Sequence, residues 1–243
     1  MPAPHAKGNF TGELRCLLQE QNDREKHRSQ SVMKMKVWTA TVKMSLFLKR
    51  FFDILLSVLA LIVLMPFFIL LAILIKLDSR GPVFFVQDRV GRYGRHFRFY
   101  KFRSMYQGAE LEKAKLLSQN QSTDGVIFKM KKDPRITRVG RIIRKTSIDE
   151  LPQFFNVLFG DMSLVGPRPP LPSEVQKYTL EDRKRLNIKP GLTCLWQIKG
   201  RSDIPFKEQV RLDKEYIQAQ SLKQDLLILL RTIPAIISGR GAY

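Results

Sequence analysis

An uncharged apolar run constrains this chain more than any other feature of its sequence. From Ile54 to Ile75 the sequence reads ILLSVLALIVLMPFFILLAILI, 22 residues without a charged side chain. A straight helix needs roughly 20 apolar residues to cross the hydrocarbon core of a bilayer. The run is too long and starts too late for a signal peptide, and no small-residue cleavage site follows it. The sequence therefore predicts a membrane helix.

Two details leave the course of that helix open. Pro66 lies just past the middle of the run, where a proline removes a backbone hydrogen bond and bends a helix. Lys49 and Arg50 precede the run, and Lys76 and Arg80 follow it. Because basic residues flank both ends, the positive-inside rule assigns no orientation. A kinked single span and a re-entrant helix that returns to the same side both fit these features.

The rest of the chain divides around this run. Residues 1–45 are polar and mixed in charge, so we expect a mobile basic and polar tail there, with an amphipathic approach to the membrane around Val37–Leu48. Residues 46–78 form the predicted membrane helix, bent at Pro66. Residues 79–243 are long enough to bury a core of their own and are predicted to form one domain.

The charge of the chain suggests an anionic partner. It carries 42 Lys and Arg against 22 Asp and Glu, a formal net charge of +20. Residues 76–145 alone hold 18 basic and 6 acidic residues. Nucleic acid, an anionic membrane surface and phosphorylated substrates all suit such a chain. No helix-turn-helix, zinc or RNP pattern is recognisable, so charge alone favours a membrane-tethered nucleic-acid binder.

Secondary-structure patterns after the apolar run are short. Val83–Gln87 and His96–Phe102 have the composition of strands. Residues 106–121 have the spacing of an amphipathic helix, and Asp225–Ser238 that of an apolar helix bent at Pro234. We place this last helix on the membrane surface, although packing in the core fits nearly as well. The predicted fold class is α+β, a small membrane-associated domain with amphipathic interfacial helices.

Two adjacent carboxylates, Asp149 and Glu150, stand in this basic background. Ser147 and Glu150 have the spacing of a capping box, in which the acidic pair would only stabilise a helix N-terminus. Arg144 lies just upstream, and Arg168 follows in the stiff loop GPRPP, where its planar guanidinium suits a phosphate. An ionised aspartate can attack phosphorus or hold Mg²⁺ beside substrate phosphates. From spacing alone, a helix cap, a metal site and a nucleophile all stay open.

Four segments resemble, in order, the bacterial sugar transferase family of monotopic polyprenyl-phosphate phosphoglycosyl transferases. They are the stretch from KRFFDILL to KFRSM, the block DPRITRVGRIIRKTSIDELPQFFNVLFGDMSLVGPRPP, the loop PGLTCLWQIKGRSD and the end DLLILLRTIPAIISGRGAY. The resemblance covers about Leu48 to Tyr243. It implies a short form of the family, without the extra N-terminal transmembrane helices of its long members.

The resemblance implies a reaction and a location. A sugar-1-phosphate would pass from a UDP-sugar to undecaprenyl phosphate in two ping-pong steps with release of UMP, as the first membrane step of exopolysaccharide, capsule or O-antigen synthesis. The loop LWQIKGRSD resembles members that transfer hexose phosphate, which favours UDP-galactose or UDP-glucose. The implied partners also include membrane lipids but no nucleic acid, and homodimer formation stays open. The catalytic domain, residues 79–243, would lie on the cytoplasmic face of the bacterial inner membrane.

The same resemblance implies roles for individual residues. Asp149 matches the nucleophile that would carry the phosphosugar, and Glu150 matches its partner carboxylate. Both are expected to hold Mg²⁺, and Glu150 would alternatively assist the second attack. Contacts with phosphate or with the nucleotide-sugar are expected from five further residues: Lys101, Arg144, Arg168, Gln197 and Arg201.

Two consequences of the resemblance concern the membrane helix and the alternatives. The family's helix is re-entrant, which favours re-entry at Pro66. Many members have Ser before this proline, whereas here Met65 lacks the hydroxyl that helps satisfy freed backbone groups. A catalytically inactive scaffold of the same family remains the alternative within the family, and the intact Asp149, Glu150 and Arg168 argue against it.

Overall fold

The computed structural model describes residues 10–113, 115–116, 120–121, 126–128, 130, 132–239 and 241. The chain forms two compact units, Met1–Leu48 and Lys49–Tyr243. Helix α1, Phe10–Asp78, runs through both of them. Of the tail that we predicted for residues 1–45, residues 1–9 lie outside the described residues, and the rest is helical from Phe10 onward. No proline or glycine occurs between Glu13 and Met65, so no residue there interrupts a helix.

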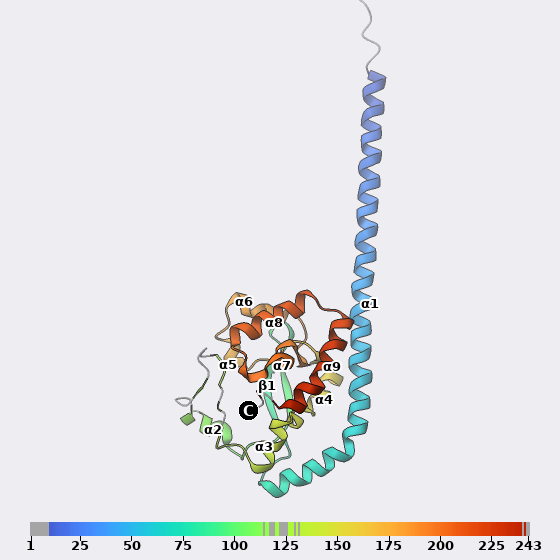
Figure 1. Ribbon diagram of the computed structural model, residues 1–243. Coiled ribbons are helices and arrows are strands. Elements are labelled where there is room, and N and C mark those ends of the chain that lie inside the picture. Colours follow the sequence, from blue (N-terminus) through green and yellow to red (C-terminus); the bar gives the residue numbers. More distant parts are fainter. Residues whose placement is uncertain are drawn as a thin grey trace, which may run out of the picture. The chain divides into compact units, whose positions relative to one another are not determined.

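The apolar part of α1 has a buried face and an exposed face. Among the described residues one helical segment, Arg28–Asp78, is long and apolar enough to cross a membrane. Within the second unit the ribbon of α1 changes direction sharply (Figure 1), and Pro66 lies inside the helix. Asp53 and Ser57 are buried against the domain. Large apolar side chains are exposed on the rest of this segment, among them Phe51, Leu55, Leu59, Ile62, Val63, Phe67, Leu70 and Leu74.

Two small sheets organise the second unit. Strand β1, Phe84–Val90, pairs antiparallel with β2, His96–Phe102, and the register places Phe84 opposite Phe102. Strand β3, Ser163–Val165, pairs in parallel with β4, Gly191–Thr193. The bounds of β2 are those predicted. Strand β1 starts one residue later than predicted and runs on to Val90, because the hairpin turn at the short helix η1, Arg92–Gly94, keeps both strands paired to their ends.

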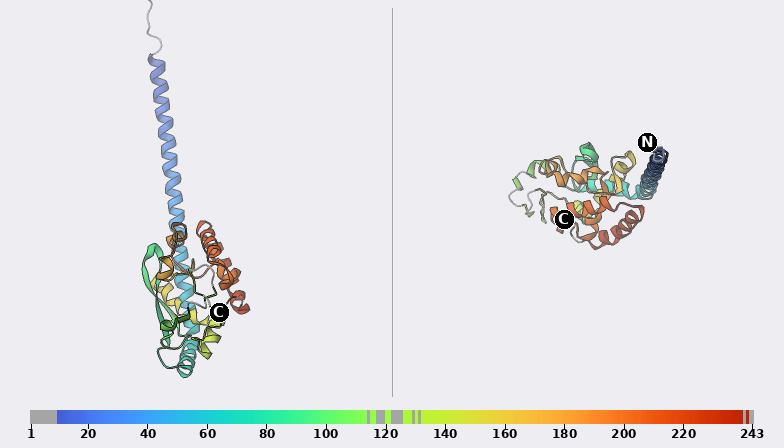
Figure 2. Two further views of the ribbon diagram at one scale, coloured as in Figure 1. Left: turned by 90° about the vertical axis from the view of Figure 1, so that its left-hand side faces the viewer. Right: turned by 90° about the horizontal axis from the view of Figure 1, so that it is seen from above.

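Short helices surround these sheets. Figure 2 shows the green β1–β2 hairpin on one side of the second unit and the orange and red helices on the opposite side. The predicted helix over residues 106–121 is helix α2, whose Leu111 is exposed, and part of that range lies outside the described residues. The helices after β2 are α2 (Ala109–Lys113), α3 (Arg138–Lys145), η3 (Ile148–Glu150), α4 (Gln153–Phe159), α5 (Pro172–Val175), α6 (Leu180–Arg183), η4 (Lys184–Asn187), α7 (Leu195–Lys199), η5 (Arg201–Asp203), α8 (Phe206–Gln218) and α9 (Leu222–Ser238).

The two faces of β2 belong to two hydrophobic clusters. Phe99 lies in the main core, which joins β2 and β3 to the helices α4, α7, α8 and α9. Phe102 lies in a second cluster with Leu71 and Ile75 of α1 and Ile143 of α3. Opposite faces for these two phenylalanines follow from the alternation of side chains along a strand. The structure confirms the predicted mixture of helix and strand.

Helix α9 packs in the core with one face, and its predicted place on the membrane surface stays a prediction. Ile228 is buried in the main core, whereas Leu226, Leu230, Ile233 and Ile237 are exposed. Pro234 lies inside the helix, as predicted. The helix therefore packs on the domain with one face and presents an apolar face outward.

Helix α1 also binds the strand that leads to the arginine loop. The carboxylate of Asp53 accepts a hydrogen bond from the backbone N–H of Leu164 (2.9 Å). The ammonium of Lys49 donates to the carbonyl of Val165 (3.1 Å) and pairs with Asp225 of α9 (2.6 Å). Strand β3 is thereby held by α1 on one side and by β4 on the other.

Candidate active site

The turn that carries the two carboxylates differs from the predicted capping box. Ser147 lies in the left-handed region (φ 56°, ψ 19°), and its side chain makes no capping hydrogen bond. Asp149 and Glu150 lie in the short helix η3, and α4 begins only at Gln153, after Pro152. The capping box prediction was wrong, because tertiary partners bind both of its side chains. The carboxylate of Glu150 pairs with cations, and the hydroxyl of Ser147 accepts from Arg201.

Glu150 is held by two cations from different segments. Arg168 binds both carboxylate oxygens, with Nη1 3.1 Å from Oε2 and Nη2 in short contact with Oε1. Lys101 of β2 donates to Oε1 from 2.8 Å. Burial by itself would raise the pKa of the Glu150 carboxyl, but Arg168 and Lys101 outweigh it and hold that pKa well below its ordinary value. Glu150 is therefore ionised and fixed in position.

Asp149 is buried beside this cluster but is less tightly bound. The contact between its Oδ2 and Lys101 Nζ measures 3.8 Å, longer than a hydrogen bond. Burial raises the pKa of the Asp149 carboxyl, and the attraction of Lys101 reduces this effect without cancelling it. The oxygens of Asp149 are thus available to a bound molecule, whereas those of Glu150 are occupied.

Close backbone packing sets the position of Arg168. Arg168 follows β3 in the chain. Just after this strand, the backbone of Gly166 lies very close to Gly191 of β4. If Gly191 had a Cβ, that atom would lie 2.0 Å from the nitrogen of Gly166. Only glycines allow this approach. From β1, Arg89 donates to the carbonyl of Pro169 (3.0 Å) and so braces the loop from the other side. Burial and the neighbouring Arg168 lower the pKa of Arg89 to about 10, which leaves it a cation at neutral pH.

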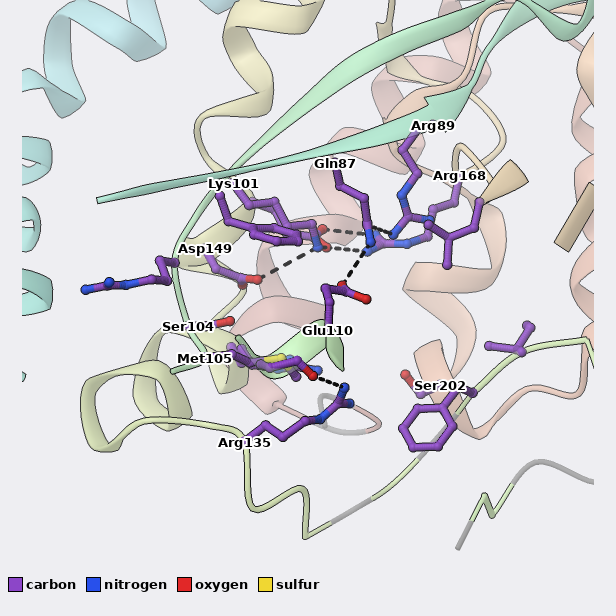
Figure 3. Close-up of a pocket in the computed structure, with 18 of the residues that line it drawn as sticks. Gln87, Arg89, Lys101, Ser104, Met105, Glu110, Arg135, Asp149, Arg168 and Ser202 are labelled. Atoms are coloured by element: carbon purple, nitrogen blue, oxygen red, sulfur yellow. Dashed lines mark hydrogen bonds and ion pairs between the residues drawn. The ribbon is translucent and has the colours of Figure 1, made fainter. Parts of the chain in front are cut away.

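A cavity of about 690 Å³ opens beside the carboxylates, a size typical of small-molecule sites. Figure 3 shows Lys101, Arg89 and Arg168 reaching it from separate segments, with Asp149 alongside. The structure places every predicted catalytic and substrate-binding residue in its lining: Lys101, Arg144, Asp149, Glu150, Arg168, Gln197 and Arg201.

Four of these seven residues contact one another in a cluster, and the other three lie outside it. Lys101, Asp149, Glu150 and Arg168 make the cluster of ion pairs. Arg144 and Gln197 line the cavity apart from it, and Gln197 accepts a hydrogen bond from the buried free thiol of Cys194. Arg201 reaches the cluster through Ser147.

Among the lining residues that sequence reasoning did not predict, three bear on the chemistry of the cavity. They are Arg89, Ser147 and Trp196. The indole nitrogen of Trp196 is buried without a hydrogen-bond partner in the part of the chain that the structure describes. A basic residue at an alternate position of β1 was the signal available for Arg89. Ser147 gave no signal, because its contact with Arg201 is tertiary.

The predicted Mg²⁺ fits Asp149 better than Glu150. Across the described residues, no three His, Cys, Asp or Glu side chains come together as a group that could hold a metal ion. Mg²⁺ needs only one or two carboxylates when substrate phosphates and water supply the other oxygens. Asp149 meets this need, since it faces the cavity with a long contact to Lys101. Glu150 would first have to release Lys101 or Arg168.

The comparison with known proteins decides the family. The family model described as bacterial sugar transferase matches residues 44–239. The chain belongs to the bacterial sugar transferase family. This confirms the resemblance seen in the four sequence segments.

Several curated proteins are similar to this chain, and their names refer to sugar transfer or to polysaccharide production. The chain is 52% identical over 195 residues to the galactosyl transferase CpsE of Streptococcus agalactiae, which covers 80% of this chain and 43% of the relative. It is 43% identical over 219 residues to the undecaprenyl-phosphate galactose phosphotransferase of Salmonella typhimurium, covering 88% of this chain and 46% of the relative. The exopolysaccharide production protein ExoY of Sinorhizobium fredii is 40% identical over 198 residues, covering 80% of this chain and 88% of that protein. The chain thus spans less than half the length of the first two relatives.

Proposed function

We propose that this chain transfers a sugar-1-phosphate from a UDP-sugar to undecaprenyl phosphate, as a membrane enzyme that starts the synthesis of a surface polysaccharide. The names of the relatives support the acceptor and the reaction class. The observation that carries the mechanism is the contrast within the carboxylate pair. Glu150 is locked by Arg168 and Lys101, whereas Asp149 faces the cavity with its oxygens available.

In the first step, a carboxylate oxygen of Asp149 attacks the sugar-linked phosphorus of the donor. A bond forms between that oxygen and phosphorus, and the bond from phosphorus to the oxygen of the UMP portion breaks. UMP leaves with the electron pair, and the phosphosugar stays on Asp149 as an acyl phosphate. Lys101 and Arg168 lie where they can stabilise the negative charge that grows on the phosphate oxygens.

In the second step, undecaprenyl phosphate takes the phosphosugar. A phosphate oxygen of the lipid attacks the same phosphorus, the bond to Asp149 breaks, and the carboxylate is restored. The product is an undecaprenyl diphosphate sugar. Dividing the transfer in two lets a water-soluble donor and a lipid acceptor use one nucleophile in turn.

Mg²⁺ is part of the proposal, held by Asp149 with donor phosphates and water. When bound, the ion neutralises phosphate charge and so makes phosphorus easier to attack. The chain's own cations contribute independently of it. Arg144 and Arg201 line the cavity and can bind the diphosphate, and Gln197 can bind the nucleotide-sugar.

We also propose a membrane location for this reaction. The apolar face of α1 enters one leaflet, bends at Pro66 and returns, so that residues 79–243 stay on the cytoplasmic face of the bacterial inner membrane. The exposed apolar side chains of α1 and α9 support burial in lipid. The basic excess of residues 76–145 suits anionic head groups, each well-placed cation contributing about 1 kcal/mol.

UMP release from a panel of UDP-sugars tests the proposed function. Detergent-solubilised protein with Mg²⁺ and undecaprenyl phosphate should release UMP from one donor, with UDP-galactose and UDP-glucose the first candidates. Asp149→Asn removes the nucleophile and should lower the rate by about a thousand-fold or more. Omission of Mg²⁺ should also abolish the release.

The matched control replaces a carboxylate outside the cavity. Asp88 is exposed on β1, and Asp88→Asn should release UMP at the wild-type rate. If folded wild-type protein released no UMP from any donor, the proposed function would fall. If Asp149→Asn kept the wild-type rate, the transfer would stand, but Asp149 could not be its nucleophile.

A further inference from the structure

Three residues other than glycine have a positive φ in the part of the chain that the structure describes: Tyr93, Ser147 and Arg201. Tyr93 lies in the turn between β1 and β2. The other two lie in the lining of the cavity. Such conformations are costly for residues with a Cβ, and at functional sites they are maintained by the surrounding structure.

Ser147 and Arg201 hold each other in these conformations. Arg201 Nη2 donates to Ser147 Oγ over 3.0 Å, across 54 positions of sequence. The other terminal nitrogen of Arg201, Nη1, is buried, and no described residue serves as its hydrogen-bond partner. The guanidinium thus has one nitrogen on Ser147 and a second, buried donor without a described partner, in a residue that lines the cavity.

Each partner is also fixed to its own segment. The carbonyl of Ser147 accepts from the backbone N–H of Glu150 (3.1 Å), so its conformation sets the turn that carries Asp149. The loop of Arg201 is held by the C-terminal segment, since Ser202 N–H donates to the carbonyl of Gly241 (3.2 Å). A displacement of Arg201 would therefore reach the turn that carries Asp149 through one hydrogen bond, the one that Arg201 donates to the hydroxyl of Ser147.

We propose that Ser147 is a positioning residue: through Arg201, it aligns the Asp149 turn when the phosphate of the donor occupies the free side of the Arg201 guanidinium. This inference rests on the proposed function and adds to it a link between donor binding and nucleophile alignment. Ser147 itself need not touch the donor. A planar guanidinium suits such a link, because it can bind a phosphate and a hydroxyl at once with fixed geometry.

The test separates alignment from binding. Ser147→Ala removes the hydroxyl and keeps the Cβ. We expect the single-turnover burst of UMP from the preferred UDP-sugar to slow by about tenfold, since small misplacement of a nucleophile is costly. We expect the Kd for UDP, measured by calorimetry, to stay within about twofold of the wild type, because Arg201 is still present. Tyr93→Ala, which changes the left-handed residue outside the cavity, should leave both values unchanged.

Two further variants protect the test against a folding defect. Ser147→Asn supplies an acceptor and tolerates the left-handed region, so it should restore most of the burst. Arg201→Lys keeps the charge, but a lysine cannot bind the Ser147 hydroxyl and the donor phosphate at once. It should therefore slow the burst, and it serves as the test if Ser147→Ala does not fold.

The outcomes distinguish this inference from the proposed function. A wild-type protein without a UMP burst would overturn both. A normal wild-type burst with an equally fast Ser147→Ala burst would overturn the positioning role alone. An equal loss of burst rate and of UDP affinity in Ser147→Ala would also overturn it, since Ser147 would then act on binding.

Discussion

Asp149 and Glu150 are neighbours in the chain but occupy different electrostatic environments. Both are buried, which by itself raises the pKa of each carboxyl. Arg168 binds both oxygens of Glu150 and so reverses the shift there. The nearest cation to Asp149, Lys101, lies 3.8 Å away, and together with Arg144 and Arg168 it only reduces the effect of burial. This contrast is why we propose Asp149 as the nucleophile and Glu150 as the residue that holds Lys101 and Arg168 in place.

Arg168→Lys tests whether the reaction needs the contact of Arg168 with both carboxylate oxygens of Glu150. A lysine keeps the charge but cannot bind both oxygens of Glu150, so the cation cluster should lose its fixed geometry. We expect the rate of UMP release to fall by about ten- to a hundredfold, with the folded structure retained. Arg183 is exposed on α6, and Arg183→Lys provides the matched control. Equal rates in the two variants would show that charge alone suffices at Arg168.

Residue types and their order indicated much of the site, because the carboxylate pair and the arginine loop are short sequence features that lie only 18 residues apart. The resemblance to a family supplied Lys101, Gln197 and Arg201. Arg89 and Ser147 could not be found this way. Their importance comes from contacts with Pro169 and Arg201, which exist only after the chain has folded.

Among the helices and strands, local sequence patterns gave correct predictions where the tertiary contacts of the same residues favour the same conformation. The alternation of aromatic and basic residues gave β2 its correct bounds, because its two faces enter two apolar clusters. The capping box failed, because Lys101, Arg168 and Arg201 bind the side chains that would have capped a helix. The polarity of residues 10–45 gave no sign of a helix, although the structure has α1 there, because no proline or glycine interrupts the chain between Gly12 and Pro66.

Lys49 gives a prediction about how α1 is attached. Its ammonium pairs with Asp225 of α9, and both side chains are largely buried. Lys49→Met leaves the Asp225 carboxylate buried with the hydroxyl of Tyr216 as a remaining partner. Breaking a buried pair from one side costs about 3–5 kcal/mol, so the unfolding temperature in detergent should drop markedly.

The double variant Lys49→Met with Asp225→Leu checks the cause. It removes both charges and leaves no unpaired carboxylate, so most of the lost stability should return. If the loss of stability in the double variant equalled the sum of the losses in the two single variants, the broken ion pair would not be the cause of the loss in Lys49→Met. Because Lys49 also binds Val165 in β3, the activity of Lys49→Met would report whether α1 helps to position the Arg168 loop.

For the whole molecule, the re-entrant course that we propose for α1 rests on charge and on apolar exposure. Basic residues flank both ends of its apolar part, and a re-entrant helix leaves all of them on the cytoplasmic side. In a Cys16→Ser, Cys194→Ala background, Ser45→Cys and Ser79→Cys place one thiol at either end. A membrane-impermeant maleimide should label neither thiol in intact cells and both after permeabilisation. Labelling of one end from outside would instead show a single span.

The covalent intermediate is the central claim, and its isolation tests that claim most directly. Protein incubated with Mg²⁺ and the preferred UDP-sugar, without undecaprenyl phosphate, should gain the mass of one hexose phosphate. Proteolysis at low temperature should locate this mass on the peptide that contains Asp149, and addition of undecaprenyl phosphate should remove it. UMP release without any gain in mass, or a gain on a peptide that lacks Asp149, would contradict the claim.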